Sequence, residues 1–96
     1  MEKQQYIVTN NEKEQRFEVL EAGHLGYLEY RFHKNNIAMM HTFVPDELEG
    51  RGIASTLAHY ALEWAREHHK PVMVYCPFVA AYLKRHPEYN ELLAKA

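Results

Sequence analysis

The chain has almost none of the residue that cross-links a protein, with one cysteine, Cys76, among 96 residues. A lone cysteine excludes an internal disulfide and the four-cysteine zinc patterns, and it fits a reducing compartment. The seven histidines show no spacing that would bring three ligands to one ion. We therefore expect no metal site, and Cys76 is either a core side chain or a reactive one.

Long apolar runs are also absent. No segment approaches the roughly 20 apolar residues of a membrane span, and the N-terminal stretch MEKQQYIVTNNEKEQ has no apolar signal-peptide core. The net charge is -2 and the lysines and arginines are scattered, which argues against nucleic-acid binding. We expect a cytosolic, monomeric protein with no membrane or nucleic-acid partner.

The remaining composition, 47% hydrophobic and 25% charged, is typical of a globular chain. The length suits one domain over residues 1–96 and is too short for the two-halved dinucleotide-binding folds. Any ligand site is therefore expected to be compact.

The first half of the chain alternates apolar and polar residues, as antiparallel strands do when one face of their sheet is solvated. QYIVTN and RFEVLE flank the polar NEKEQ, and HLGYLEYRF and NIAMMHTFV flank HKN. The pattern predicts two hairpins in an antiparallel β-meander.

The second half changes to helical spacing. From Gly52 the apolar residues recur along one face of a helix, which is predicted to end at EHHKP. VMVYC, residues 72–76, is typical of a buried strand, and PFVAAYLKRH and EYNELLAKA predict two short C-terminal helices. Residues 37–76 then form a βαβ unit in which strand 72–76 lies parallel to strand 36–44. The predicted fold class is α/β.

Two of the four glycines, Gly50 and Gly52, lie in VPDELEGRGIAS, between the strand that ends at Val44 and the long helix. Backbone N–H groups at a helix start lack intrahelical partners, and with the helix dipole they form an anion site. Glycine lets an anion approach the backbone, and Ser55 adds a hydroxyl. The loop lacks the Gly-Lys-Ser/Thr ending of a P-loop, and no ribose-binding acid of a Rossmann unit follows it. An anion site and a purely structural turn are both compatible with these residues.

The stretch VPDELEGRGIASTL resembles motif A of the GNAT superfamily of acyl-CoA-dependent N-acetyltransferases, which is Gln/Arg-x-x-Gly-x-Gly/Ala between a strand and a helix. HTFVP, EGRGIAS and CPFVAAYLKRHPEY, in this order, resemble the small single-domain GNAT-like acetyltransferases over nearly the whole chain. One departure is Glu49, which stands where the pattern has Gln or Arg, and we expect its side chain to point to solvent. The resemblance implies a truncated GNAT-like fold with splayed parallel strands, and acetyl-CoA as co-substrate.

The resemblance also implies which residues hold coenzyme A. Phe43 and Val44 would face the pantetheine arm between the splayed strands. Lys84, Arg85 and His86 would reach the adenosine phosphates, or they only complement the C-terminal end of their helix. The loop would bind the pyrophosphate through Gly50, Arg51, Gly52, Ile53, Ala54 and Ser55.

Acetyl transfer needs a neutral amine, a polarised thioester carbonyl and a proton for the departing thiolate. A backbone N–H near Phe43 or Val44 would polarise the carbonyl. Cys76 ends the buried strand before a helix N-terminus, a setting that favours a thiolate, and the resemblance suggests that it takes part in transfer. His41 would act as a base or orient Cys76, and Tyr82 would protonate the coenzyme A thiolate, as in similar enzymes. A structural role explains each of these three residues as well.

The predicted function is acetyl-CoA-dependent N-acetyltransferase activity toward an amine of a protein or a small molecule. The alternative is a non-catalytic acyl-CoA-binding or protein-interaction module that has kept the pocket. Asp46, Glu47 and Glu49 would attract a cationic acceptor, yet acidic loops are usually only solvated. The sequence does not specify the acceptor.

Overall fold

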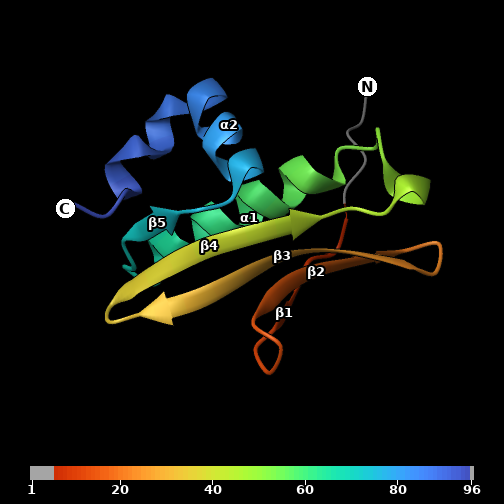
Figure 1. The fold of residues 1–96 in the computed structure, drawn as a ribbon, viewed down its shortest axis with the longest axis horizontal. Helices are drawn as coiled ribbons and strands as arrows, with labels where there is room; N and C mark the ends of the chain where they lie inside the picture. Colours follow the sequence, from red (N-terminus) through yellow and green to blue (C-terminus); the bar gives the residue numbers. More distant parts are fainter. Residues whose placement is uncertain (1–5, 96) are drawn as a thin grey trace.

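A computed structural model describes residues 6–95, which form a sheet covered by helices (Figure 1). Five strands lie in the order β1-β2-β3-β4-β5. Strands β1 to β4 pair antiparallel with their neighbours, and β5 pairs parallel to β4, so the predicted meander and βαβ unit are confirmed. The strands are β1 Thr9–Asn11, β2 Arg16–Glu21, β3 His24–His33, β4 Asn36–Phe43 and β5 Val72–Val74.

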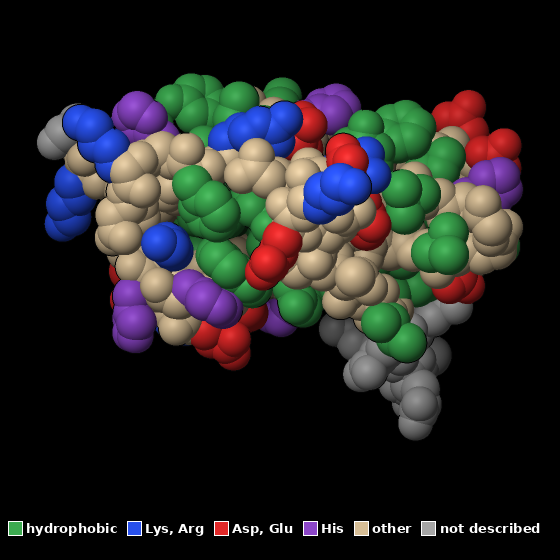
Figure 2. Space-filling model, turned by 90° about the horizontal axis from the view of Figure 1, so that it is seen from below, with side chains coloured by type: hydrophobic (Ala, Val, Ile, Leu, Met, Phe, Trp, Pro, Cys, Tyr) green, Lys and Arg blue, Asp and Glu red, His purple; other side chains and the backbone are tan. Residues whose placement is uncertain are grey.

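The two α-helices lie on the same side of the sheet (Figure 1). They are α1 Ile53–Glu67 and α2 Pro77–Arg85, with 3-10 helices η1 Asp46–Leu48 and η2 Pro87–Leu92. Helix α1 connects β4 to β5 and packs across β2 and β3, whereas α2 packs on β4 and β5. Figure 2 shows the molecule from below this arrangement, where apolar, acidic and basic side chains are interspersed. No helix within residues 6–95 is long and apolar enough to span a membrane.

The core lies between α1 and the sheet. Ile53, Leu57 and Leu62 recur at helical spacing and are almost completely buried. They belong to one cluster with alternate residues of the strands, namely Phe17, Val19, Leu28, Tyr30, Ile37 and Met39. Each large aliphatic side chain that is fully buried contributes about 1.5–3 kcal/mol relative to an exposed one, so this face of α1 holds the helix on the sheet.

Both ends of α1 lie where the sequence predicts them. Gly52 is the N-cap, with a φ of 79° in the left-handed region. At the other end His69 has a φ of 55°, and Lys70 N donates to Ala65 O at 2.9 Å, which closes the last turn. Pro71 follows and prevents continuation of the helix.

The first strand differs from its prediction. It was expected over residues 5–10, of which Gln5 lies outside the described residues, but β1 is Thr9–Asn11. Residues 6–8 leave the sheet because Tyr6 crosses to the glycine loop, where its hydroxyl donates to Arg51 O at 3.0 Å. A tertiary contact therefore overrides the apolar pattern of this short segment.

The last predicted helix is also different. EYNELLAKA, whose final residue Ala96 lies outside the described residues, was expected to be helical, but η2 spans Pro87–Leu92 and is a 3-10 helix. Tyr89 anchors this segment with 4% of its surface exposed, and Ala94 N donates to Val72 O at 2.8 Å. These two contacts stabilise the segment more than α-helix formation would, because an isolated α-helix of this length is only marginally stable.

Strands β4 and β5 part after three paired residues. Val74 is opposite Met39, and Met39 O then accepts hydrogen bonds from both Tyr75 N and Cys76 N, each at 3.0 Å. Strand β4 continues to Phe43, whereas the chain after Cys76 turns into α2. The splayed arrangement of the two parallel strands is therefore present.

A β-bulge lies at the same point on the other side of β4. Tyr30 pairs with Met39 and Glu29 with His41, so Met40 has no residue opposite it in β3. A bulge bends its strand and increases the local twist. The bulge therefore lies at the point where the pairing of β4 with β5 ends.

Candidate functional site

A groove of about 830 Å³ lies between the glycine loop with the start of α1 and the C-terminal end of α2. The loop side contributes Arg51, Gly52 and Ser55. The α2 side contributes Tyr82 and Arg85. The groove therefore joins the predicted anion site to the end of the helix that follows Cys76.

The loop presents backbone donors to this groove. The first intrahelical bond of α1 runs from Thr56 N to Gly52 O at 3.0 Å, and the Thr56 hydroxyl donates to the same oxygen at 2.9 Å. The N–H groups of Ile53, Ala54 and Ser55 precede that bond, so the helix offers them no partner. They form the positive end of the helix dipole.

The glycines are needed for the shape of this loop. Gly50 and Gly52 both have a φ of 79°, a conformation that residues with a Cβ atom rarely adopt. No other part of the described chain lies within 4 Å of a Cβ atom added at either position, so backbone conformation rather than crowding selects glycine. Glu49, which departs from the acetyltransferase pattern, is exposed to solvent.

Tyr82 forms the floor of the groove on the α2 side. Its side chain is 9% exposed and stacks on His86, with ring centroids 4.2 Å apart. Burial raises the pKa of the Tyr82 phenol, and the nearby carboxylates of Glu88 and Glu63 raise it further. Tyr82 therefore stays protonated at neutral pH, as a proton donor must be.

A hydrogen-bonded cluster that the sequence did not indicate includes two residues that line the groove, His59 and Tyr89. The Tyr89 hydroxyl donates to Glu63 Oε2 at 2.5 Å and lies 3.1 Å from His59 Nδ1. Burial, together with Glu63, raises the pKa of Tyr89. His59 and Glu63 are four residues apart and so share one face of α1, but no local signal in the sequence shows that Tyr89 packs there.

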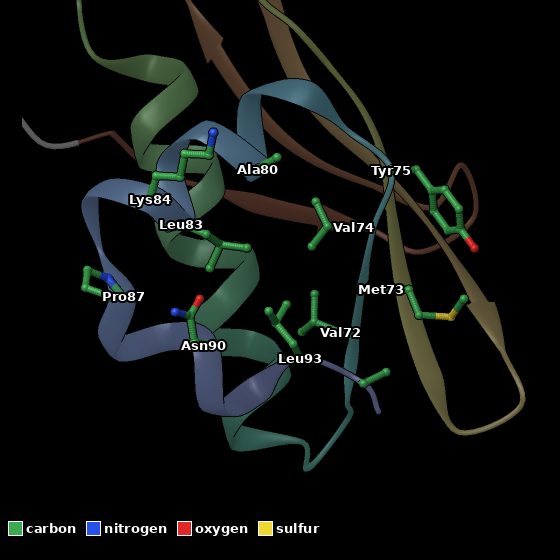
Figure 3. Close-up of a pocket in the computed structure, with 11 residues that line it drawn as sticks. Val72, Met73, Val74, Tyr75, Ala80, Leu83, Lys84, Pro87, Asn90 and Leu93 are labelled. Carbon is green, nitrogen blue, oxygen red and sulfur yellow. The ribbon is translucent and has the colours of Figure 1, made fainter. Parts of the chain in front are cut away.

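Lys84 lies in a different groove. This second groove, of about 690 Å³, runs beside β5, and Val74, Leu83 and Leu93 form part of its wall (Figure 3). Lys84 is the one charged side chain among the residues that line it. Successive residues of a helix point about 100° apart, so the neighbouring Arg85 lines the loop groove instead. Of the three basic residues that the sequence suggested for the adenosine phosphates, Arg85 and His86 line the groove of the glycine loop and Lys84 lines the other groove.

Cys76 lies where β4 and β5 part. It is the N-cap of α2, its side chain is 2% exposed, and its Sγ is 3.2 Å from Thr42 Oγ1. Pro77 occupies the first helical position, where its missing N–H costs no hydrogen bond. The strand predicted over residues 72–76 thus ends at Val74, and Cys76 lies in the turn before α2, where its thiol faces β4.

His41 lies on the other face of β4. It is exposed, and its ring makes an edge contact with Tyr27, with centroids 6.4 Å apart. Phe43 also contacts Tyr27, at 5.6 Å between centroids, whereas Val44 packs against the core on the helix side. The structure therefore brings Thr42, rather than His41, to Cys76, and it places Phe43 and Val44 on opposite faces.

The site contains no arrangement typical of a metal centre. Within residues 6–95 no three side chains of His, Cys, Asp or Glu gather so that they could hold a metal ion. Arg51 and Arg85, which suit phosphate oxygens, outnumber the one carboxylate that lines the groove, that of Glu88. The groove is thus suited to an organic anion with phosphate groups.

Comparison with known proteins identifies a family for most of the chain. The family model described as GCN5-related N-acetyl-transferase matches residues 16–92. The protein named NATD1 is 36% identical over 62 residues in Xenopus tropicalis and 37% identical over 62 residues in Homo sapiens. These alignments cover 62% of this chain and 57% and 55% of the two relatives, so the chain spans a little over half of their length.

A solved structure shares the fold. The solution structure of a GCN5-like protein from Staphylococcus aureus superposes with a TM-score of 0.73 at 26% sequence identity. The superposition covers 95% of this chain and 90% of that one. The predicted fold class is therefore confirmed over the sheet and the helices that form both grooves.

Proposed function

Because the chain belongs to the GCN5-related N-acetyltransferase family, we propose that it transfers the acetyl group of acetyl-CoA to an amine. The family and the fold support acetyl transfer in general. The observation that carries the proposal for this chain is the loop Gly50-Arg51-Gly52, whose two glycines are left-handed and which leads into α1 beside the groove that Arg85 lines.

The residues of the groove fit coenzyme A. The N–H groups of Ile53, Ala54 and Ser55 would donate to its pyrophosphate, which the dipole of α1 also favours. Arg51 and Arg85 would hold the adenosine phosphates from the two sides. Of the basic residues that the sequence suggested for this contact, the proposal uses Arg85, since Lys84 lines the other groove.

The pantetheine arm and the thioester would lie where β4 and β5 part. Beyond Met39 the two strands no longer pair, so backbone groups of β4 are free to bind a ligand instead of β5. An N–H of β4 near Phe43 or Val44 would donate to the acetyl carbonyl oxygen. This donor stabilises the negative charge that develops on the oxygen during transfer.

Cys76 would carry the acetyl group in the first step. Its thiolate forms a bond to the acetyl carbon while the bond from that carbon to the coenzyme A sulfur breaks. Tyr82, which its surroundings keep protonated, gives its proton to the departing thiolate and recovers one from water. The product of this step is acetyl-Cys76 and free coenzyme A.

His41 would act in the second step, from the open face of the sheet. The amine nitrogen forms a bond to the acetyl carbon while the bond to Cys76 Sγ breaks, and Cys76 returns as a thiolate. His41 takes the proton that the nitrogen loses and releases it to solvent, to which its ring is exposed. His41 and Cys76 lie on opposite faces of β4, so an acceptor on the His41 face would reach acetyl-Cys76 only where β4 and β5 part.

The test of this proposal is the mass of the intact protein after mixing with acetyl-CoA. We expect the addition of one acetyl group, located on Cys76 by peptide mapping, and its loss when a suitable amine is added. Cys76→Ala should form no adduct and should release much less free coenzyme A with an amine library. Unchanged turnover of Cys76→Ala would contradict the cysteine route. Coenzyme A binding without any thiol release from the wild-type protein would instead support the non-catalytic module.

A further inference from the structure

Thr42 makes the closest polar contact to the thiol of Cys76. Thr42 Oγ1 and Cys76 Sγ are 3.2 Å apart, and either atom can be the donor. The two residues come from the two strands that separate, Thr42 from β4 and Cys76 from the turn after β5. Their side chains thus bridge the gap just beyond Met39, the last residue of β4 that faces a partner in β5.

The surroundings of Cys76 make this contact important. Cys76 belongs to the hydrophobic core cluster, and no charged side chain is buried in the described part of the chain. A thiolate in such surroundings is unstable unless a hydrogen-bond donor faces it. The Thr42 hydroxyl is half-buried and within reach of the sulfur, so it can supply that donor.

A hydroxyl can partner the sulfur in both of its protonation states. It accepts from the S–H group of a thiol, and after rotation it donates its own hydrogen to a thiolate. A valine of nearly the same shape can do neither, whereas a serine can do both. A comparison of threonine, serine and valine at position 42 therefore distinguishes the effect of the hydrogen bond from the effect of side-chain packing.

We infer that Thr42 is a positioning residue for Cys76, whose hydroxyl holds the sulfur in place and stabilises its thiolate for acetyl transfer. The inference deepens the proposed function, and it rests on that function because the contact serves acetyl transfer only if Cys76 carries the acetyl group. His41, which the sequence suggested for this task, lies on the other face of β4. Thr42 has no contact with the acetyl donor in this scheme and acts through Cys76.

The inference is tested by the rate at which iodoacetamide modifies the protein at different pH values. A bond forms between Cys76 Sγ and the reagent carbon and iodide leaves, and the reaction reports one residue because the chain has a single cysteine. We expect the midpoint of the rate–pH profile of Thr42→Val to lie about one pH unit above that of the wild type, since a hydrogen bond to a charged group is lost. Thr42→Ser should keep the wild-type midpoint.

Two results would overturn the inference. Superposition of the Thr42→Val and wild-type profiles would show that the hydroxyl does not stabilise the thiolate. An equal shift in Thr42→Val and Thr42→Ser would show that packing, and not the hydroxyl, is responsible. If Thr42→Val does not fold, as judged by circular dichroism, Thr42→Ala takes its place with the same expected midpoint and the same contradicting results.

The measurement also separates this inference from the proposed function. Iodoacetamide requires no acetyl-CoA, so the profile is obtained whether or not acetyl-Cys76 forms. Absence of acetyl-Cys76 in the wild type would contradict the cysteine route alone, whereas an unshifted profile would contradict the role of Thr42 alone. Where acetyl-Cys76 forms, Thr42→Val should slow its formation at pH 7 about tenfold and leave the half-saturating acetyl-CoA concentration unchanged.

Discussion

Lys84 and Arg85 are neighbours in the chain, yet they line different grooves of the molecule. Lys84 borders the apolar groove beside β5, and Arg85 borders the groove of the glycine loop. The turn of about 100° between successive helical residues is sufficient to separate them. The pair therefore gives a matched test of which groove holds coenzyme A.

We predict that Arg85→Gln weakens acetyl-CoA binding about tenfold, because a charged hydrogen bond to phosphate is lost. Lys84→Gln removes a charge of the same sign from the other groove, so it should leave the dissociation constant within about twofold. Calorimetric titration measures both. The reverse order of effects would place the cofactor phosphates in the groove beside β5.

The loop is tested by Gly52→Ala and Gly23→Ala. Both glycines have a φ of 79° and open space around an added Cβ, but Gly23 lies in the turn between β2 and β3. Each substitution should destabilise the protein by about 1–2 kcal/mol in chemical denaturation, the cost of a left-handed residue with a Cβ. Only Gly52→Ala should also weaken acetyl-CoA binding. Equal affinity of the two variants would mean that the loop shape serves folding alone.

Tyr82→Phe tests the proton donor. We expect kcat to fall about 100-fold, because the departing thiolate loses its general acid. Tyr60→Phe is the control, since Tyr60 lines the same groove and packs against the core but has no role in proton transfer, so kcat should be unchanged. Because its surroundings raise the pKa of Tyr82 above the usual value near 10, the donor stays protonated as the pH rises to that value. A loss of activity between pH 8 and 9 that disappears in Tyr82→Phe would contradict this assignment.

Tyr89 makes folding stability depend on alkaline pH. Its pKa is raised in the folded protein, first by burial and then by Glu63, so the protonated phenol favours the folded state. This contribution is complete below the unfolded pKa near 10 and is lost as the pH rises through the folded pKa. The free energy of unfolding in urea should therefore decline above pH 10, and less steeply in Tyr89→Phe. Tyr75→Phe is the control, because Tyr75 is exposed, and its free energy of unfolding should decline as steeply as that of the wild type. An equally steep decline in Tyr89→Phe would contradict the prediction.

The sequence predicts those parts of the fold that follow from local periodicity. Alternation predicts the meander, and helical spacing with Gly52 and Pro71 predicts α1 and both of its ends. The same reasoning places Cys76 at the start of α2. These elements can be predicted because the apolar residues of each buried face recur at a regular spacing along the sequence.

Features that depend on tertiary contacts could not be predicted in the same way. The bulge at Met40 arises from the register between β3 and β4, which no single strand encodes. The last segment becomes η2 because Tyr89 is anchored on Glu63 of α1. The contact between Thr42 and Cys76 is an intermediate case, because alternation along β4 already places Thr42 on the face opposite His41.

The central claim, that this chain uses acetyl-CoA for acetyl transfer, is tested most directly by calorimetric titration with acetyl-CoA, followed by an assay of free thiol in the presence of amines. The account predicts saturable binding at one site and coenzyme A release that depends on both the amine and Cys76. The absence of binding at millimolar acetyl-CoA would contradict it.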